Sequence, residues 1–558
     1  MTLLYRQIFP DFIDVLPEIV KDIESSAFIS FDGEFTGLAN ERNIMPFDTS
    51  EEYYEKQLKA SKGFILIQLG LTFFKSVKDD DGKEQIKLKS YNIYVYPQSR
   101  NATFSCQGSS LSFLAENGFD FNKLLSSGIS YSNTTEEEKL RQEMKEKQAI
   151  RMEQLKAKLS TEEPDLTTRN FIPVPDNEKE FLNGAREKIQ NVADGKVTET
   201  MFDKANPFQR KLIYELIERE FNNKVSTKML TIENNRKAMI VEPKRSDEEE
   251  MLVEKNRQLE DEKYIVDTVG LRLLLKEISG SKKLVVGHNC LLDLMYLMTQ
   301  CVEDLPTDYN DFKTLTHRVF PNIIDTKFVG SSEKFRDMFT STVLKQLYDQ
   351  LQKPPFHKVE FEFENPHVAY NLETPKEHEA GYDSFLTGYC FLVILKYLKV
   401  PLDDFQPNKC KELNPFLNRI ALFRIQQPYI YVTGKEPAIT RDHVFSIKFP
   451  TTWQTSDVQD HFKNYGPVHC AWVNNGSAFV SLYNRENASC VIKTIARPAE
   501  FEIQSLADHQ QQEKRDLSRK RKKENSESSE TSVSAANGSK PGRKKKRGKK
   551  TFAESDQW

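Results

Sequence analysis

The sequence predicts an α/β fold from two observations. Near the N-terminus, the stretches 28–38, 63–74 and 91–97 are apolar, are separated by turn residues and are typical of a β-meander. Residues 264–400 then alternate short apolar strands with helical patterns, as expected for an α/β core. With 558 residues, the chain is long enough for about three to four domains.

The composition narrows the class of protein. Residues are 38% hydrophobic and 29% charged, and no apolar run approaches the roughly 18 residues of a membrane span. The first ten residues lack the apolar region of a secretory signal. The seven cysteines are scattered without a Cys-x-x-Cys pair, which disfavours a disulfide framework or a thiolate zinc site. We therefore expect a reduced, intracellular protein without a membrane segment.

Charge is unevenly distributed along the chain. The formal net charge is −4, but residues 513–558 hold 15 Lys and Arg against seven Asp and Glu. The rest of the chain is therefore acidic, and tight binding of nucleic acid over its whole surface is not expected. Any contact with nucleic acid must come from local sites.

The first predicted strand carries two acids. Asp32 and Glu34 are two residues apart, so their side chains point to the same face of the strand. Two carboxylates on one face repel each other unless a cation lies between them, and hard divalent cations prefer such oxygen ligands. The alternative is a solvated strand end with two exposed acids. If the pair is considered alone, this alternative is favoured.

The middle of the chain is interpreted as an insertion. Residues 136–159 are densely charged and predict an exposed helix, and the segment 175–242 after it has its own apolar periodicity. A predicted helix that starts at Asn206 has apolar residues at helical spacing, namely Phe208, Leu212, Ile213 and Leu216. This pattern predicts a small inserted domain.

A third acid lies near the start of a later helix. Leu284–Val286 predicts a short strand, and Asn289 is placed to cap the helix that follows, so that Asp293 falls near its first turn. Apolar neighbours surround Asp293, and a buried acid needs a partner. A surface acid favoured by the helix dipole is the equally weighted alternative.

The last predicted helix of the core, 379–397, brings a histidine and a fourth acid. His378 and Asp383 are five residues apart, about 500° on one helix, and cannot share a face. We therefore expect His378 in the loop before the helix and Asp383 inside it. A histidine at such a position is otherwise structural or solvated.

Taken in this order, the acids and the histidine resemble the four-carboxylate-plus-histidine (DEDDh) 3′–5′ exonuclease superfamily, which has a ribonuclease-H-like fold. Four stretches extend the resemblance to the PARN family of poly(A)-specific ribonucleases, the deadenylases: Phe31–Gly37, Gly287–Asp293, Asp325–Lys327 and His378–Asp383. The similarity covers nearly the whole chain up to its basic tail, and no catalytic position departs from the family pattern.

The residue types fit hydrolysis of a phosphodiester, which needs an activated water and a stabilised leaving oxygen. Two Mg²⁺ ions about 3.5–4 Å apart supply both in such sites. The resemblance implies that four acids hold the ions and that His378 is the general base. The predicted metal ligands are Asp32, Glu34, Asp293 and Asp383. The expected products are 5′-AMP and a shortened RNA.

Three more residues are predicted to contact the substrate. The resemblance places the Asp325–Lys327 segment near the site without making Asp325 a primary ligand, and it suits Lys327 for contact with RNA phosphate or base. Phe35 and Leu292 flank catalytic acids and are candidates to pack on the terminal adenines. The alternatives are an exposed lysine and ordinary core packing.

The predicted domains follow from these assignments. The exonuclease core comprises residues 1–165 and 260–430, and the inserted domain, 170–245, is similar to small single-strand-binding domains with an Arg-x3-His signature. Residues 440–505 resemble an RRM, and 508–558 form a tail that is expected to be disordered.

The accessory domains depart from their family patterns. The inserted domain has Arg210 and Tyr214 in place of the Arg-x3-His pair, so only a weak RNA-binding or docking role is expected. The RRM-like domain has one aromatic, Phe479, on its central strand, which makes ordinary base reading doubtful. Trp472 matches the position that stacks on the 7-methylguanosine (m7G) cap in this family, and half-buried packing is its rival interpretation.

The basic tail contains two dense clusters, 519–523 and 543–550, which favour nuclear import over a merely solvated tail. We expect a protein of the nucleus and cytoplasm. The resemblance also implies a homodimer.

The predicted function is a Mg²⁺-dependent 3′–5′ exoribonuclease that removes poly(A) tails and is stimulated by the 5′ cap. One alternative is a PARN-like trimmer of small non-coding RNA 3′ ends, for which a C-terminal membrane segment is expected. Two further candidates are a catalytically silent RNA-binding scaffold and the single-domain nuclease subunit of a large deadenylase complex. The complete set of catalytic residue types disfavours the scaffold, and the added domains disfavour the single-domain subunit.

Overall fold

The computed structural model describes residues 12–516, with gaps at 39–43, 98–101, 161–171, 223, 233–235, 365–368, 373, 403–404 and 514. By contacts between residues, the chain divides into two compact units. The first contains 54–423 and 429–435 together with the N-terminal residues up to 41, and the second contains 42–53, 424–428 and everything from 436 onward.

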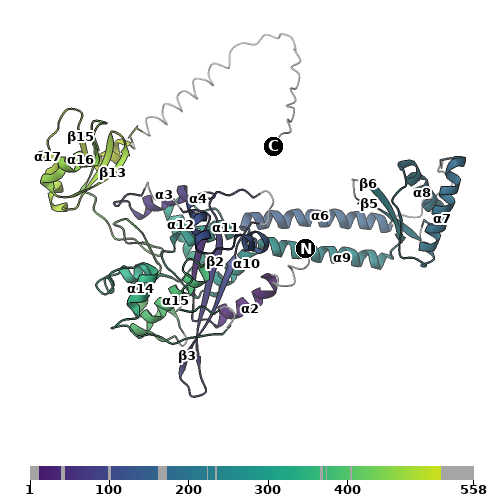
Figure 1. Ribbon diagram of the computed structural model, residues 1–558, viewed down its shortest axis with the longest axis horizontal. Helices are drawn as coiled ribbons and strands as arrows, with labels where there is room; N and C mark the ends of the chain where they lie inside the picture. Colours follow the sequence, from purple (N-terminus) through teal and green to yellow (C-terminus); the bar gives the residue numbers. More distant parts are fainter. Residues whose placement is uncertain are drawn as a thin grey trace, which may run out of the picture. The chain divides into compact units, whose positions relative to one another are not determined.

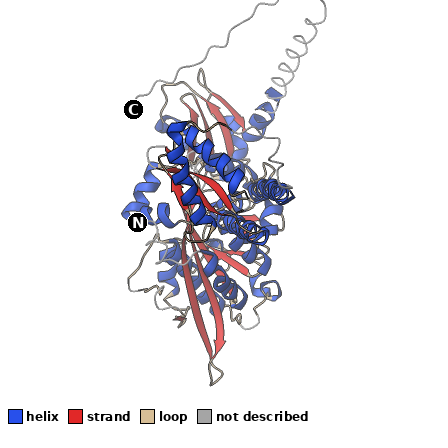
Figure 2. Cartoon of the chain, turned by 90° about the vertical axis from the view of Figure 1, so that its right-hand side faces the viewer, coloured by secondary structure: helices blue, strands red, loops and turns tan. Residues whose placement is uncertain are grey.

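An eight-stranded mixed sheet forms the centre of the first unit (Figures 1 and 2). The three long strands of the predicted meander pair antiparallel, and β7, β8 and β10 continue the sheet in parallel from β1. In spatial order the strands are β11 (Tyr429–Tyr431), β10 (Arg419–Ala421), β8 (Ile323–Asp325), β7 (Leu284–Gly287), β1 (Phe28–Phe35), β2 (Leu66–Lys78), β3 (Glu84–Tyr94) and β9 (Glu362–Phe363).

Helices surround this sheet (Figure 2). They are α2 (Phe12–Ser25), α3 (Ser50–Ser61), α4 (Gly108–Glu116), α5 (Phe121–Ser127), α10 (Leu271–Ser281), α11 (Leu291–Cys301), α12 (Tyr309–Val319), α13 (Thr326–Ser331), α14 (Leu344–Leu351) and α15 (Ala380–Tyr397). Helix α15 packs against β1 and β2 and is apolar almost all round, as expected for a helix enclosed by the core. It is the helix that the sequence predicted at 379–397.

Small residues and hydroxyls let α15 approach the sheet closely. A Cβ at Gly70 of β2 would lie 1.8 Å from the carbonyl oxygen of Ala380, so only glycine fits there. The Ser30 hydroxyl donates to the Ser384 carbonyl at 2.7 Å, and the hydroxyls of Ser384 and Thr72 share a hydrogen bond of 3.0 Å. These contacts position the start of α15 against the middle of the sheet.

The predicted insertion forms a small sheet with its own core. Its elements are η3 (Asp176–Glu178), α7 (Lys179–Ala193), β4 (Thr200–Phe202), α8 (Pro207–Glu220), β5 (Val225–Ile232) and β6 (Arg236–Pro243), with strand order β4-β6-β5. The helix predicted from Asn206 begins at Pro207, and Asn206 is its cap, accepting a hydrogen bond from Gln209 N. Helices α6 (Thr134–Ser160) and α9 (Asp247–Val269) flank the insertion in the sequence and pack against each other (Figure 1).

Most of the second unit is a βαββαβ fold. Its sheet has the order β13-β14-β12-β15, formed by β12 (Val444–Lys448), β13 (Val468–Asn474), β14 (Ser477–Leu482) and β15 (Glu502–Ser505). Helices α16 (Thr455–Phe462) and α17 (Ala488–Thr494) complete it. This alternation is the one predicted for an RRM-like domain, whose sheet normally stacks RNA bases.

One face of this RRM-like sheet is covered by residues of the same unit. Phe479 of β14 contacts Phe47 at 5.7 Å and His509 at 5.2 Å between ring centroids. Phe47, Val444 and Leu506 are buried together, and Leu506 begins a helix directly after β15. Phe479, the one aromatic residue of the central strand, therefore packs against other residues of the same unit.

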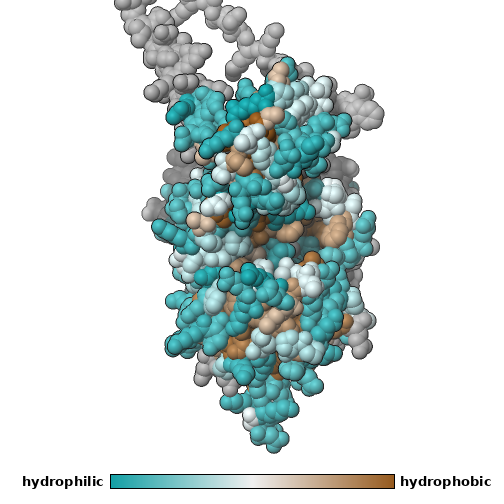
Figure 3. All heavy atoms as spheres, turned by 90° about the vertical axis from the view of Figure 1, so that its left-hand side faces the viewer, coloured by the Kyte–Doolittle hydropathy of each residue, from teal (hydrophilic) through white to brown (hydrophobic). Residues whose placement is uncertain are grey.

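The surface agrees with the high content of charged residues. The face shown in Figure 3 is mainly hydrophilic, with smaller hydrophobic patches between the polar atoms. Among the described residues, no helix is both long and apolar enough to cross a bilayer.

Candidate active site

Strand β1 presents Asp32 and Glu34 on one face, as predicted. Along the strand, Phe31 and Gly33 are buried, whereas Asp32 and Glu34 are half-buried. Opposite them on β2 lie Gly70 and Gln68. The alternation of the strand therefore brings both carboxylates to the surface of the sheet at the C-terminal end of β1.

The start of α15 supplies the next two residues. Asp383 lies in the first turn of the helix, and His378 precedes the helix with a left-handed backbone, φ 69°. The His378 backbone N–H donates to Asp383 Oδ2 at 3.0 Å, which closes the turn. Two strand side chains hold the first N–H groups of the helix, because Gln68 accepts from Ala380 N at 3.0 Å and Asn92 from Gly381 N at 3.3 Å.

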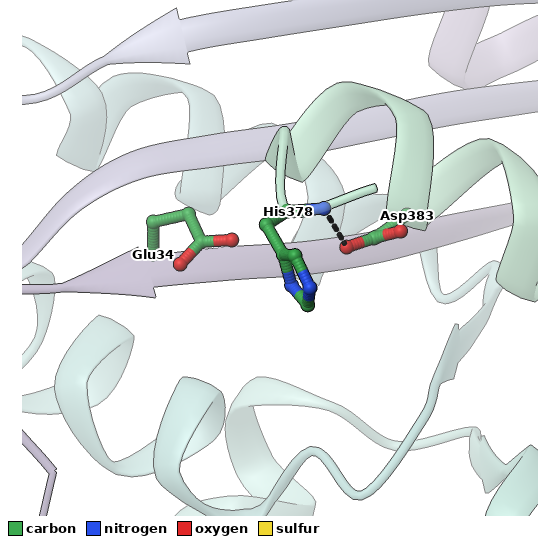
Figure 4. A group of neighbouring side chains, drawn as sticks. All are labelled: Glu34, His378 and Asp383. Carbon is green, nitrogen blue, oxygen red and sulfur yellow. Dashed lines mark hydrogen bonds between the residues drawn. The ribbon is translucent and has the colours of Figure 1, made fainter. Parts of the chain in front are cut away.

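These two elements bring three predicted residues together (Figure 4). Glu34, His378 and Asp383 each offer a ligand atom, and these atoms all lie within 4.8 Å of one another. The His378 ring packs edge-on against Phe113 of α4, with 4.6 Å between ring centroids. Phe113 was not predicted, since only the tertiary fold brings its helix to the site.

Helix α11 supplies the fourth acid. Asp293 lies in its first turn and is only 6% exposed. No hydrogen-bond donor among the described residues reaches Asp293 Oδ1. A Cβ at Gly33 of β1 would lie 3.0 Å from this oxygen, so the glycine between the two strand acids lets Asp293 come close. Gly33 is a second residue that was not predicted, because no motif in the sequence singles it out.

The four carboxyl groups interact electrostatically. Burial and the charges of Asp293, Asp383 and Glu34 raise the pKa of Asp32 well above its usual value. Burial and the charges of Asp383 and Asp293 do the same for the pKa of Glu34. Burial also raises the pKa values of Asp293 and Asp383, each to about 7. Mutual repulsion of this kind is expected where acids converge without a countercharge.

This arrangement fits a divalent cation. Carboxylate oxygens are the ligands that Mg²⁺ prefers, and a buried oxygen without a donor, as at Asp293, is available for such a bond. A cation would also offset the repulsion that raises the pKa values of Asp32 and Glu34, and it would stabilise the charged forms of the buried Asp293 and Asp383. The donor set is therefore suited to a hard metal ion, with the imidazole of His378 beside it.

Asp325 has a different role from the four acids. It is fully buried, and its carboxylate accepts hydrogen bonds from the backbone N–H groups of Asn289, Cys290, Lys327 and Ala421 at 2.9–3.2 Å. The Asp325 side chain thus joins three segments of the chain at the C-terminal end of strand β8. This agrees with the expectation that Asp325 lies near the site without being a primary ligand.

The predicted cap of α11 is corrected by this contact. The helix begins at Leu291 with Cys290 as its N-cap residue, and Asn289 lies outside it with φ 57°. The distant Asp325 carboxylate, rather than the Asn289 side chain, fixes this end of the helix, because it accepts hydrogen bonds from the N–H groups of Asn289 and Cys290 directly before it. A capping pattern in the sequence cannot reveal a cap supplied from 36 residues away.

The residues predicted to contact substrate remain predictions. Phe35 is half-buried and packs against Tyr296, with 4.8 Å between ring centroids, and Leu292 is half-buried on α11. Lys327 is half-buried, its ammonium lies 4.7 Å from the centre of the Phe423 ring, and burial lowers its pKa. None of the three is enclosed in the core.

In the second unit, Trp472 is half-buried on strand β13. Its indole N–H donates to Thr455 Oγ1 at 3.1 Å, and its ring meets Phe449 edge-on at 4.9 Å. Part of the ring therefore packs within the domain and part is accessible. In the insertion, Tyr214 is 43% exposed, while Arg210 donates to the Lys237 carbonyl at 2.7 Å.

The central strand of the mixed sheet carries two acids, each of two helices adds one more, and a histidine lies beside them. This arrangement defines a class of 3′–5′ exonucleases. Comparison with known sequences agrees with this class. The model described as CAF1 family ribonuclease matches residues 10–391, and the model described as RNA binding domain matches residues 434–512. The chain therefore belongs to the CAF1 ribonuclease family, in the branch of the PARN deadenylases.

Individual relatives support this placement. Poly(A)-specific ribonuclease PARN of Xenopus laevis is 32% identical, covering 92% of this chain and 82% of its own. The protein of the same name from Bos taurus is 33% identical, covering 91% and 81%. The pre-piRNA 3′-exonuclease trimmer of Bombyx mori is 24% identical, covering 88% and 91%. The relatives thus include both deadenylases and a trimmer.

Proposed function

We propose that this 3′–5′ exoribonuclease removes poly(A) from the 3′ ends of RNA, depends on Mg²⁺ and releases 5′-AMP. One observation carries the proposal: four carboxyl groups from β1, α11 and α15 converge beside His378. The poly(A)-specific names of the relatives with about one-third identity support the choice of substrate.

The acids are proposed to hold two Mg²⁺ ions. Asp32 and Glu34 approach from the strand, Asp293 from α11 and Asp383 from α15. When bound, a pair of divalent ions supplies electrostatic stabilisation of the attacking and leaving oxygens in phosphodiester hydrolysis. The protein itself fixes the directions from which the carboxylates approach, through the contacts of α15 with the sheet and of α11 with Asp325.

His378 is proposed to accept the proton of the attacking water. Its ring lies against Phe113, and its backbone N–H is bound to Asp383, so the position of the imidazole is restricted on both sides. A ring nitrogen of His378 lies within 4.8 Å of the carboxylates of Glu34 and Asp383, a separation that one water molecule can bridge. Imidazole is the side-chain group best suited to proton transfer at neutral pH.

Contacts with the terminal nucleotides are proposed for three residues beside the acids. Phe35 and Leu292 each neighbour a catalytic acid in the sequence and offer apolar surface to adenine. Lys327 offers an ammonium group to RNA phosphate or base. Stacking on protein side chains is worth about 1–3 kcal/mol per base, so these contacts contribute mainly to substrate affinity.

The test is hydrolysis of 5′-labelled oligo(A), oligo(U) and 3′-phosphorylated oligo(A), each with Mg²⁺ and with EDTA. We expect shortening of oligo(A) only with Mg²⁺ and a free 3′-hydroxyl, slower shortening of oligo(U), and 5′-AMP as the product. Asp32→Ala should abolish activity. Rapid hydrolysis by Asp32→Ala, or equal activity in EDTA, would contradict the mechanism, and equal rates on oligo(U) would contradict the base preference.

We also propose that Trp472 binds the 5′ m7G cap and that the cap stimulates activity. The accessible part of its indole can stack on a cationic methylated guanine. Trp472→Ala should weaken binding of a cap analogue about tenfold or more in a fluorescence titration. Trp453, which is stacked between Phe449 and Phe501, provides a control position, and Trp453→Phe should leave cap affinity unchanged.

A PARN-like trimmer of small RNA is the second candidate, because a trimmer is among the relatives. The match of an RNA-binding domain model to 434–512 and the higher identity to PARN proteins favour the deadenylase. We also propose that the protein forms a homodimer and is located in the nucleus and the cytoplasm. The two basic clusters that suggest nuclear import lie outside the described residues.

A further inference from the structure

A cavity of about 620 Å³ lies beside the candidate active site in the first unit. Its floor is formed by Met295 and Tyr296 of α11, which are buried, and Phe64 is half-buried at its wall. The second half of α3, the residues directly after it and the loop after α11 complete the lining. A cavity of this volume, with apolar walls and a few polar groups, is typical of sites for nucleotide-sized ligands.

Helix α11 connects this cavity to the acids. Tyr296 and Thr299 line the cavity, and Asp293 lies three and six residues before them, about 60° and 120° away around the same helix. At 1.5 Å per residue, Thr299 is only about 9 Å along the helix axis from Asp293. The path over the helix surface is longer than this axial distance, so an RNA strand of several nucleotides is needed to contact both positions.

Strand β1 makes a second connection to the same cavity. Phe35, directly after Glu34, packs against Tyr296 at 4.8 Å, and the Tyr296 hydroxyl donates to the Gly37 carbonyl at 3.1 Å. Phe64 covers Gly37 so closely that a Cβ there would lie 2.4 Å from the ring. Apolar side chains thus continue from the catalytic strand to the wall of the cavity.

The cavity lining carries charges of both signs, Lys59 and Lys62 together with Glu55 and Asp304, and the two ammonium groups are the ones available to a phosphate. Lys59 and Lys62 are both exposed at its edge, and Lys59 has only a loose ion pair with Glu55, 4.0 Å between nitrogen and oxygen. An ammonium group at the edge of an apolar pocket suits a nucleotide, whose base enters the pocket while its phosphate remains at the surface.

From this geometry we propose that the cavity binds nucleotides of the RNA strand that lie upstream of the one being removed. The base occupies the space between Phe64 and Tyr296, and the phosphate meets Lys59 and Lys62. This inference rests on the proposed function. It predicts that the protein prefers RNA long enough to reach from the acids to the cavity.

The test compares kcat/KM on a trinucleotide and a decanucleotide of adenylate. Two variants are tested separately: Lys59→Glu/Lys62→Glu removes the positive charges, and Thr299→Trp fills the cavity from its exposed rim. In each of them, activity on the decanucleotide should fall about tenfold. Activity on the trinucleotide should change less than about twofold. The matched control, Lys334→Glu/Lys358→Glu, makes the same change of net charge at exposed positions outside the cavity lining.

A binding measurement separates this inference from the proposed function. Fluorescence anisotropy with a labelled decanucleotide is carried out in Mg²⁺ on His378→Ala protein, with and without Thr299→Trp. We expect about tenfold weaker binding with Thr299→Trp. Equal losses on both RNA lengths, no loss on the decanucleotide, or unchanged affinity would overturn the upstream site. Failure of the wild-type protein to hydrolyse any RNA would instead overturn the proposed function.

Discussion

At the scale of single residues, the acids of the candidate site are suited to metal binding, and in the absence of metal their buried charges lower the stability of the folded state. Burial raises the pKa of Asp383 to about 7, whereas an unfolded chain releases that proton near pH 4. The folded state therefore holds protons that the unfolded state has released. The resulting stabilisation is complete below pH 4 and is lost as the pH rises through about 7.

Asp383→Asn should separate activity from stability. Asparagine keeps an oxygen that accepts the His378 N–H but removes one charge from the cluster, so we expect at least a hundredfold loss of hydrolysis. In EDTA at pH 8, the free energy of unfolding should rise by about 1–2 kcal/mol. Chemical denaturation at pH 5 and pH 8 measures this difference.

The wild type serves as the control at each pH, because other titrating groups are the same in both proteins. The gain should shrink toward pH 5, where the wild-type carboxyl group is protonated. A variant that is less stable than the wild type at pH 8 in EDTA would show that the buried charge of Asp383 does not destabilise the metal-free fold.

The residue types of the site were predictable from the sequence, and their surroundings were not. Asp32, Glu34, Asp293, His378 and Asp383 form a pattern that is visible along the chain. Gly33 and Phe113 act through contacts with residues far away in the sequence, namely Asp293 and His378. Gly33 lies between the two strand acids, but the spacing of those acids does not require a glycine there, and Phe113 belongs to no motif, so only the fold identifies their roles.

At the scale of elements, helix starts are positioned by side chains from other elements. Asp325 on β8 satisfies N–H groups at the start of α11, and Gln68 and Asn92 on β2 and β3 do so for α15. The sequence predicted both helices, but it predicted the wrong cap for α11. Local propensity determines where a helix forms, whereas long-range hydrogen bonds determine where its first turn lies.

Asp325→Ala should destabilise the protein strongly. Four backbone N–H groups lose their acceptor inside the sheet edge, and each buried unpaired donor costs about 1–3 kcal/mol. We expect a loss of roughly 3–5 kcal/mol, measured by urea denaturation, together with a loss of activity. By contrast, Asp293→Asn should lose activity without any loss of stability in EDTA. Similar stabilities for the two variants would contradict the distinction between a structural acid and the site acids.

Gly70→Ala should move the start of α15. The new methyl group would lie 1.8 Å from the Ala380 carbonyl oxygen, which is possible only if the helix shifts away from β2. We expect kcat/KM to fall about tenfold and the unfolding temperature to drop by several degrees.

Gly280→Ala in α10 is the control, because no atom lies within 4 Å of its Cβ position. It should preserve activity and raise stability by about 0.5–1 kcal/mol. Equal effects of both substitutions would refute the role given to Gly70.

At the scale of the whole molecule, the two units are not consecutive in the sequence. Residues 42–53 belong with the RRM-like unit, although they lie between β1 and most of the first unit in the chain. The RRM-like fold itself was predictable from its alternating strands and helices. The attachment of 42–53 was not, because it depends on contacts between residues about 430 positions apart, such as Phe47 and Phe479.

Phe47→Ala should destabilise the RRM-like unit. The ring is 3% exposed and packs on Phe479, so its removal should cost about 3 kcal/mol. Unfolding is followed by tryptophan fluorescence in a Trp558→Phe background, where Trp453 and Trp472 report on this unit. Phe208→Ala, at an exposed position of the insertion, is the control and should leave the transition unchanged. An unaltered transition in Phe47→Ala would show that the segment 42–53 does not support this unit.

The placement of Phe47 changes how shortened versions of the protein should be interpreted. Cleavage after residue 435 removes the sheet that covers Phe47 and leaves an aromatic ring exposed only twelve residues after Phe35. Reduced activity or aggregation of such a fragment would then reflect an uncovered hydrophobic side chain as much as a missing RNA-binding surface. A fair comparison pairs the truncation with Phe47→Ser, so that the two effects can be separated.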